Sequence, residues 1–141
     1  MNIKRLLLAI VVAFIFIFAT DFLIHAVWLK PDYNATKELW RPDAEMTARF
    51  PWMVGAHLLI AAAFVMIWAL GFADRGSAGL ACGYGLLIGL LVQATTIITY
   101  VVSPLPPSIA LKWFVSGVVQ SVLLGLVVWL VYKPSPKKSL A

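Results

Sequence analysis

Residues 6–28, LLLAIVVAFIFIFATDFLIHAVW, form an apolar run long enough to cross a membrane. A helix needs about 20 apolar residues to span the hydrocarbon core of a bilayer, and this run carries no charge before Asp21. Asp21 and His25 are four residues apart, so a helix places them one above the other on the same face. Ionisable side chains inside such a segment usually face a protein interior or a watery cavity. The run therefore predicts a transmembrane helix with a polar site near its end.

The composition of the whole chain is that of an integral membrane protein. Its 141 residues are 62% hydrophobic and 12% charged, with a mean hydropathy of +0.95, whereas soluble domains carry about 25% charged residues. The net charge of +5 is dispersed over the ends of apolar segments, which is typical of membrane flanks and does not indicate nucleic-acid binding. Cys82 is the only cysteine, which excludes an intrachain disulfide and a cysteine-rich metal site, and we interpret it as a helix-packing residue.

Four apolar segments predict a single all-α membrane domain, residues 1–141, folded as an antiparallel bundle of four transmembrane helices. We expect the spans at about residues 6–29, 52–72, 78–102 and 109–132. The first segment begins like a secretory signal, but no cleavage site follows and apolarity resumes after Asp21, so we expect an uncleaved helix. Small residues four apart predict close approach between helix backbones at Gly79, Gly83, Gly85, Gly89, Gly117, Ser121 and Gly125.

The connection of residues 30–51 is the only long polar segment between spans. We expect one helical turn within residues 34–40 and a second helical start at residues 42–46, where a proline precedes acidic residues. Tyr33, Trp40 and Trp52 are expected to anchor the segment at the membrane interface. A lid over the bundle and a plain interfacial connector are both compatible with it. The basic tail, residues 133–141, is expected to be disordered.

The distribution of Lys and Arg favours cytoplasmic termini. One side would hold six of these residues and the other five, and the pair Lys4-Arg5 precedes the first span. Because basic residues flank the cytoplasmic side of membrane helices, we expect both termini in the cytoplasm.

Polar residues of all four predicted helices fall in the same half of the membrane, the outer half. The inner half is almost entirely Leu, Ile, Val, Ala and Phe. This asymmetry predicts a polar pocket that opens outward and that the 31–51 loop can cover. The residues expected to bound it are Asp21, His25, His57, Gln93, Thr96, Tyr100 and Gln120.

A binding module for a metal ion, a haem or a small polar ligand is the first function that fits such a pocket. Neutral imidazoles on facing helices can ligate haem iron, and two histidines with one carboxylate suit a first-row metal. The expected metal ligands are His25, His57 and Asp21, with Met53 and Glu45 as further candidates.

The main rival is a structural protein in which these side chains only satisfy one another. Such a protein would serve as an accessory subunit of a larger membrane complex, docking through residues 40–46, or would assemble with itself as a homo-oligomer. An enzyme is the least supported class, because the sequence contains no Ser-His-Asp arrangement, paired catalytic carboxylates or phosphate-binding loop.

Proton-coupled transport is the third function considered. A carboxylate in the first span of a very small four-helix protein is similar to the architecture of the small multidrug resistance transporters, which work as dimers around such a residue. The similarity is limited to architecture, because Asp21 lies near the outer end of its span and that family's surrounding glutamate motif is absent.

Three segments together resemble a group of small uncharacterised four-helix proteins of the bacterial inner membrane. They are DFLIH at residues 21–25, LWRPDAEM at residues 39–46, and His57. The resemblance covers nearly the whole chain. It implies the four-helix fold and an inner-membrane location, and it implies no mechanism.

Overall fold

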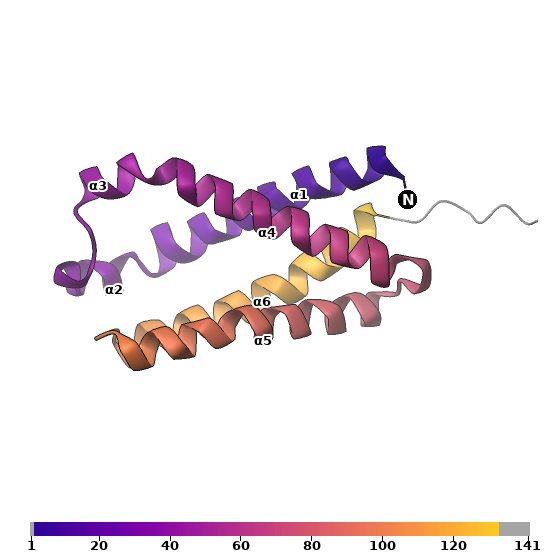
Figure 1. Ribbon diagram of the computed structural model, residues 1–141. Helices are drawn as coiled ribbons and strands as arrows, with labels where there is room; N and C mark the ends of the chain where they lie inside the picture. Colours follow the sequence, from indigo (N-terminus) through magenta and orange to yellow (C-terminus); the bar gives the residue numbers. More distant parts are fainter. Residues whose placement is uncertain (1, 133–141) are drawn as a thin grey trace, which may run out of the picture.

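The computed structural model describes residues 2–132, and within them the chain is helical with short turns and no strand (Figure 1). The first span consists of an α-helix that continues directly into a π-helix. The elements in chain order are α1 (Ile3–Asp21), the π-helix η1 (Phe22–Trp28), α2 (Lys30–Ala35), the 3₁₀ turn η2 (Lys37–Leu39), α3 (Asp43–Ala48), α4 (Phe50–Gly71), the 3₁₀ turn η3 (Ala73–Arg75), α5 (Ala78–Val102) and α6 (Pro107–Val131).

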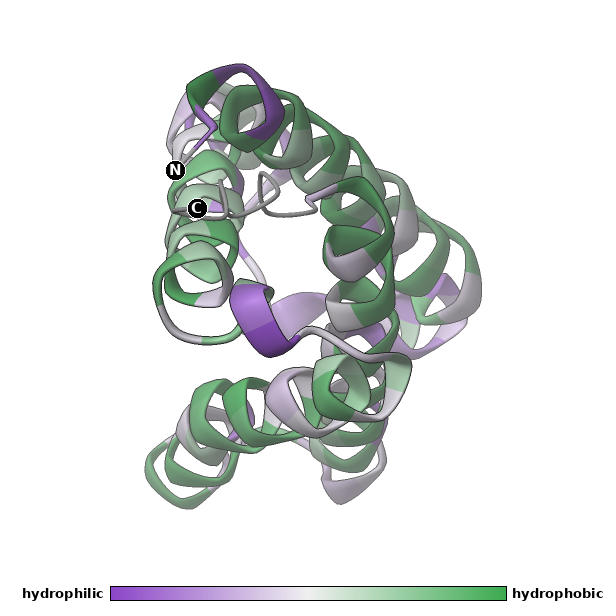
Figure 2. Ribbon diagram, turned by 90° about the vertical axis from the view of Figure 1, so that its right-hand side faces the viewer, coloured by the Kyte–Doolittle hydropathy of each residue, from purple (hydrophilic) through white to green (hydrophobic). Residues whose placement is uncertain are grey.

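Four of these helices, α1 with η1, α4, α5 and α6, are long and apolar enough to cross a membrane. Figure 2 shows hydrophobic colour along most of their length, with hydrophilic colour confined to short stretches. The prediction of an all-α fold with four membrane-length helices is confirmed, and the chain is a multi-pass membrane protein. The tail predicted at residues 133–141 lies outside the described residues.

Local chemistry explains where these helices begin. The side chain of Asn2 accepts a hydrogen bond from Arg5 N at 3.1 Å, and Ser77 caps α5 in the same way through Leu80 N at 3.2 Å. Proline occupies the first turn of α4 and of α6, where its missing N–H costs nothing. Since α1 begins at Ile3, Lys4 and Arg5 are part of its first turn.

Glycines bring α5 and α6 into close contact. A Cβ added to Gly85 would collide with the backbone of Ser121, and one added to Gly125 would collide with the carbonyl oxygen of Ala81. The residue numbers of the contacts thus increase along α5 as they decrease along α6, so these two helices run in opposite directions. Gly79 and Gly83 make no such close approach within the single chain, because none of its described residues lies within 4 Å of an added Cβ there.

The apolar core lies in the half of the bundle that contains the start of α1 and the end of α6. Its centre is Trp68, which is fully buried and packs beside Phe72 and Tyr84, and Phe64 packs on the Tyr84 ring. The Tyr84 hydroxyl donates to the Phe64 carbonyl at 2.5 Å and so joins α5 to α4. Toward the other end α4 diverges from α5 and α6 (Figure 1), and the polar residues gather there.

Candidate functional site

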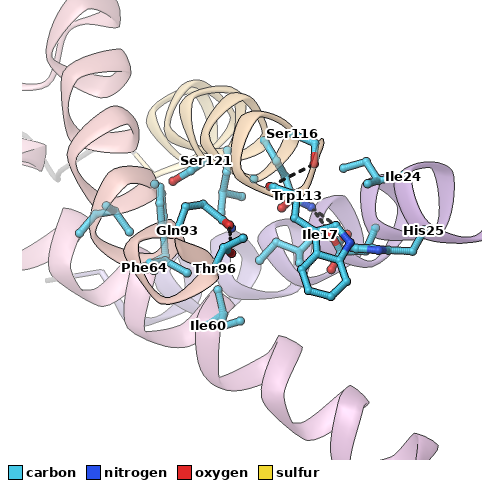
Figure 3. Close-up of a pocket in the computed structure, with 17 residues that line it drawn as sticks. Ile17, Ile24, His25, Ile60, Phe64, Gln93, Thr96, Trp113, Ser116 and Ser121 are labelled. Carbon is cyan, nitrogen blue, oxygen red and sulfur yellow. Dashed lines mark hydrogen bonds between the residues drawn. The ribbon is translucent and has the colours of Figure 1, made fainter. Parts of the chain in front are cut away.

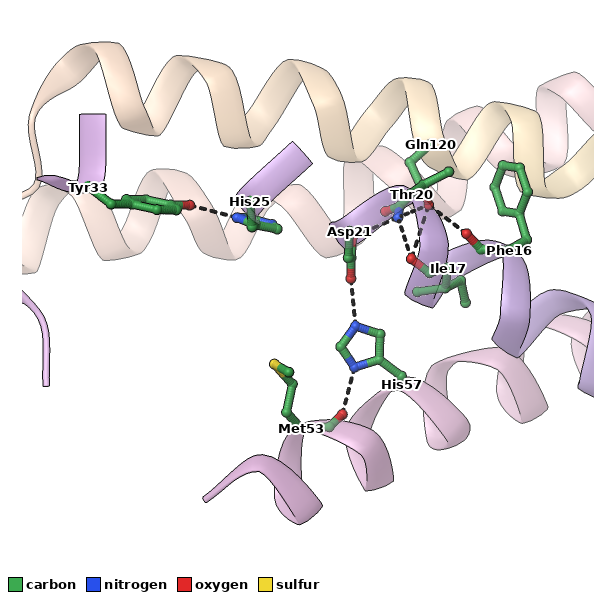
Figure 4. Close-up of polar contacts among 9 residues, drawn as sticks. All are labelled: Phe16, Ile17, Thr20, Asp21, His25, Tyr33, Met53, His57 and Gln120. Carbon is green, nitrogen blue, oxygen red and sulfur yellow. Dashed lines mark hydrogen bonds and ion pairs between the residues drawn. The ribbon is translucent and has the colours of Figure 1, made fainter. Parts of the chain in front are cut away.

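A π-helix ends the first span and changes the partners of its ionisable residues. In η1 the hydrogen bonds join residues five apart, as from Leu29 N to Ile24 O at 2.8 Å. Asp21 and His25 turn to different partners, Asp21 to α4 and α6 and His25 to α2 (Figure 4). Segments of π-helix are rare and occur frequently at functional sites.

Asp21 is the junction of three helices. Its Oδ2 lies 2.6 Å from His57 Nε2 of α4, and its Oδ1 accepts a hydrogen bond from Gln120 Nε2 of α6 at 2.7 Å (Figure 4). The Gln120 amide also donates to Thr20 Oγ1 at 2.6 Å. With side chains only 28% and 12% exposed, Asp21 and His57 are held in a largely enclosed setting.

The partners of His57 determine how many protons the Asp21–His57 pair holds. His57 Nδ1 lies 2.6 Å from the carbonyl oxygen of Met53, which can only accept, so Nδ1 carries a hydrogen. The short contact from Nε2 to Asp21 Oδ2 needs one further proton, whichever atom carries it. With that proton the pair has no net charge, which lowers the cost of holding it inside a membrane.

His25 belongs to a second network at the end of the first span. Its Nδ1 lies 2.6 Å from the hydroxyl of Tyr33, which also accepts a hydrogen bond from Trp113 Nε1 at 2.7 Å. Burial raises the pKa of the Tyr33 phenol above its ordinary value, and the hydrogen bond from Trp113 partly opposes this shift. Directly beside this cluster, Lys112, which precedes Trp113 in α6, binds Asp32 at 2.8 Å.

A cavity of about 300 Å³ lies between α1, α4, α5 and α6, and we call it the intramembrane cavity (Figure 3). Seven of its 17 lining residues are isoleucine, valine, leucine or phenylalanine. Its polar lining contains five of the residues expected from the sequence, and it adds three that the expected set omitted. The five are Asp21, His25, Gln93, Thr96 and Gln120, and the three are Trp113, Ser116 and Ser121.

The sequence contained a signal for two of the omitted residues. Trp113, Ser116 and Gln120 follow at spacings of three and four, which places them on one face of α6. Ser121 was interpreted only as a small packing residue, and it also lines the cavity beside Gly89.

Several hydrogen-bonding atoms of the cavity residues have no partner in the part of the chain that the structure describes. Thr96 Oγ1 donates to Gln93 Oε1 at 2.7 Å. Within residues 2–132 no hydrogen bond uses Nε2 of Gln93, Oε1 of Gln120 or Nε2 of His25. The cavity residues thus retain an amide donor, an amide acceptor and an imidazole nitrogen.

Four expected site residues lie outside the lining of the intramembrane cavity. His57 does not line the cavity and binds Asp21, which does. Tyr100 is 42% exposed and lines a separate apolar depression with Pro107 and Phe114. Met53 offers its carbonyl to His57, and Glu45 pairs with two arginines of its own segment.

The expected metal set is not gathered into one site. Among residues 2–132 no group of three His, Cys, Asp or Glu side chains is placed to hold a metal ion. Both ring nitrogens of His57 and both oxygens of Asp21 already have protein partners. In this arrangement Asp21 and His57 bind each other, and His25 belongs to the separate network with Tyr33.

Comparison of the chain with models of protein families, with curated proteins and with solved structures found no match.

Proposed function

We propose that this protein is a membrane-embedded binding module that holds a small polar ligand in the intramembrane cavity. One observation carries the proposal: unpaired hydrogen-bonding groups of Gln93, Gln120 and His25 meet apolar walls at membrane depth. Ligand sites combine a mostly apolar wall with a few such polar groups. A volume of about 300 Å³ suits a small molecule.

The charge of the site favours an uncharged ligand. Asp21 is compensated by the proton it shares with His57 and by the donated N–H of Gln120. A cation entering the cavity would therefore meet no uncompensated carboxylate. A neutral molecule with one donor and one acceptor, such as an amide, matches the free atoms of Gln93 and Gln120.

A thermal-shift screen of the purified protein with small neutral amides, alcohols and phenols tests this proposal. A compound that binds the cavity should raise the unfolding temperature of the wild type and lose most of that effect in Gln93→Leu and Thr96→Val. Thr95→Val is the matched control, because Thr95 is exposed on the same helix and lines no cavity described here. A panel that stabilises the Gln93→Leu variant and the wild type equally would contradict the proposal.

The shared proton of Asp21 and His57 favours a second candidate, proton-coupled transport by an oligomer. An Asp–His pair that exchanges one proton can couple that proton to the occupancy of the adjacent cavity. In this case Asp21→Asn should abolish proton-driven flux in proteoliposomes while the variant still folds. Flux that persists in Asp21→Asn would reject the transporter.

The third candidate is an accessory subunit of a larger membrane complex, for which the same networks serve stability alone. It predicts that mild solubilisation recovers a stoichiometric partner and that the cavity variants change stability without changing ligand binding.

We also propose that the protein resides in the bacterial inner membrane with both termini in the cytoplasm. Lys4 and Arg5 in the first turn of α1 support this orientation. Cysteines introduced at Asp74 and at Asn34, in Cys82→Ser, should be labelled by an impermeant thiol reagent from opposite sides.

A further inference from the structure

A second cavity, of about 550 Å³, lies between the α2–α3 segment and Trp113 of α6. We call it the interfacial cavity. The α2–α3 segment begins at Lys30, two residues after the first span ends at Trp28, and it stops before α4 begins at Phe50. Because this segment connects the ends of two spans, we expect it to lie at the depth of the lipid headgroups. It shares the wall residue Trp113 with the intramembrane cavity, and none of the site residues expected from the sequence lines it.

Three aromatic rings form one wall of the interfacial cavity. The Tyr33 and Trp40 rings are 5.2 Å apart between centroids, and the Trp40 and Trp113 rings 6.0 Å apart. The polar atoms of both indoles are already bound, Trp40 Nε1 to Thr36 Oγ1 at 3.0 Å and Trp113 Nε1 to the Tyr33 hydroxyl. The rings are thus fixed in place, and aromatic rings attract ammonium groups.

Charged side chains of both signs complete the lining. Lys37 is exposed and has no ion pair within the described residues, and Arg41 has one long exposed contact of 3.4 Å to Glu45. Exposed pairs of this kind hold their partners weakly, so both cations are free to contact an anion. Asp43 adds one carboxylate to the same cavity.

We propose that the interfacial cavity binds the headgroup of an aminophospholipid. Lys37 and Arg41 contact the phosphate, while Asp43 and the aromatic wall receive the ammonium group. The combination of two cations, one carboxylate and three rings matches a headgroup that carries both charges, and the acyl chains of such a lipid remain in the bilayer beside the spans. This site is independent of the ligand proposed for the intramembrane cavity.

The test is native mass spectrometry of the full chain in detergent, titrated with phosphatidylethanolamine and with phosphatidylglycerol. We expect tighter binding of phosphatidylethanolamine. The double variant Lys37→Gln/Arg41→Gln should weaken both lipids about tenfold or more, since each basic residue near a lipid surface contributes about 1 kcal/mol. Asp43→Asn should abolish the preference for phosphatidylethanolamine while leaving phosphatidylglycerol binding unchanged.

The matched control is Lys30→Gln/Arg49→Gln, which removes the same charge from two exposed residues that do not line the cavity. Equal weakening in both double variants would show general surface attraction and overturn the proposal. So would a wild type that binds phosphatidylglycerol as tightly as phosphatidylethanolamine. Soluble phosphoethanolamine is the last arm: if it binds as tightly as the lipid, the ligand is a soluble phosphate and the lipid assignment is wrong.

Discussion

His57 Nε2 lies 2.6 Å from Asp21 Oδ2, and within residues 2–132 this is the one side-chain hydrogen bond that joins α1 to α4. Asp21 also binds Gln120 of α6, so one carboxylate ties three membrane helices together at the level where α4 diverges from α5. The same carboxylate lines the intramembrane cavity. Structure and ligand binding therefore depend on the same residue, and they must be separated by the choice of substitution.

Asp21→Leu and Asp21→Asn should have different effects. Leucine leaves His57 and Gln120 without their partner, and an unsatisfied, largely enclosed polar group costs about 1–3 kcal/mol. Asparagine can donate to His57 Nε2 and accept from Gln120, so it should retain the fold with a loss below about 1 kcal/mol. Denaturant titration of both variants in detergent measures the difference.

His57→Leu serves as the control, because it removes the opposite member of the pair and should resemble Asp21→Leu. If Asp21→Asn were as unstable as Asp21→Leu, the fold would require the ionised carboxylate. Asparagine would then not replace its hydrogen bonds to His57 and Gln120.

Tyr33→Phe should destabilise the fold by about 1–3 kcal/mol, because Trp113 Nε1 and His25 Nδ1 both lose the hydroxyl that binds them. Tyr100→Phe is the matched control, since the Tyr100 hydroxyl has no hydrogen bond within residues 2–132. Thermal unfolding of the two variants should separate them clearly. Equal unfolding temperatures would show that the His25–Tyr33–Trp113 network contributes nothing to stability.

Stability should fall at high pH because of Tyr33. Burial raises the pKa of its phenol above 10, so the folded state favours the protonated form. The stability that this shift contributes is complete below pH 10, the unfolded value, and is lost as pH rises through the folded pKa. Near-ultraviolet absorbance of the wild type minus that of Tyr33→Phe isolates this titration. A midpoint at or below the ordinary tyrosine value would contradict the burial described here.

Gly85→Ala and Gly83→Ala should have opposite outcomes although the positions are two residues apart. A Cβ at Gly85 meets the Ser121 backbone and must push α5 away from α6, whereas no atom of residues 2–132 lies within 4 Å of a Cβ at Gly83. Alanine is the better helix former by up to about 1 kcal/mol, so Gly83→Ala should be neutral or stabilising. If both variants lowered the unfolding temperature equally, Gly83 would belong to an interface with another chain.

The length of the hydrophobic runs predicted the helices well, because spanning a bilayer requires about 20 consecutive, mostly apolar residues. The α5 helix has the predicted bounds, and α1, α4 and α6 begin only two or three residues early. Five of the seven expected pocket residues line the intramembrane cavity, because depth along a helix follows directly from residue number.

The errors have two physical sources. The π-helix at Phe22–Trp28 changes which residues share a face, and the residue types of that run do not indicate a π-helix. Asp21 and His25 therefore have different partners, and that of Asp21 lies on another helix. The small-residue spacing could not distinguish Gly83 from Gly85, because both satisfy the same rule and only the position of α6 decides between them. Partners contributed by distant segments, such as Tyr33 for His25, are set by tertiary packing.

Metal analysis and a visible absorption spectrum should show neither stoichiometric metal nor a Soret band. The reason is that His57 uses both ring nitrogens on Met53 and Asp21, while His25 directs Nδ1 to Tyr33. His57→Ala should lower the unfolding temperature through its lost bonds, and His25→Ala should lower it less, since His25 is exposed. Stoichiometric metal that both substitutions remove would instead require the two networks to rearrange around an ion, and the proposed neutral ligand would then be wrong.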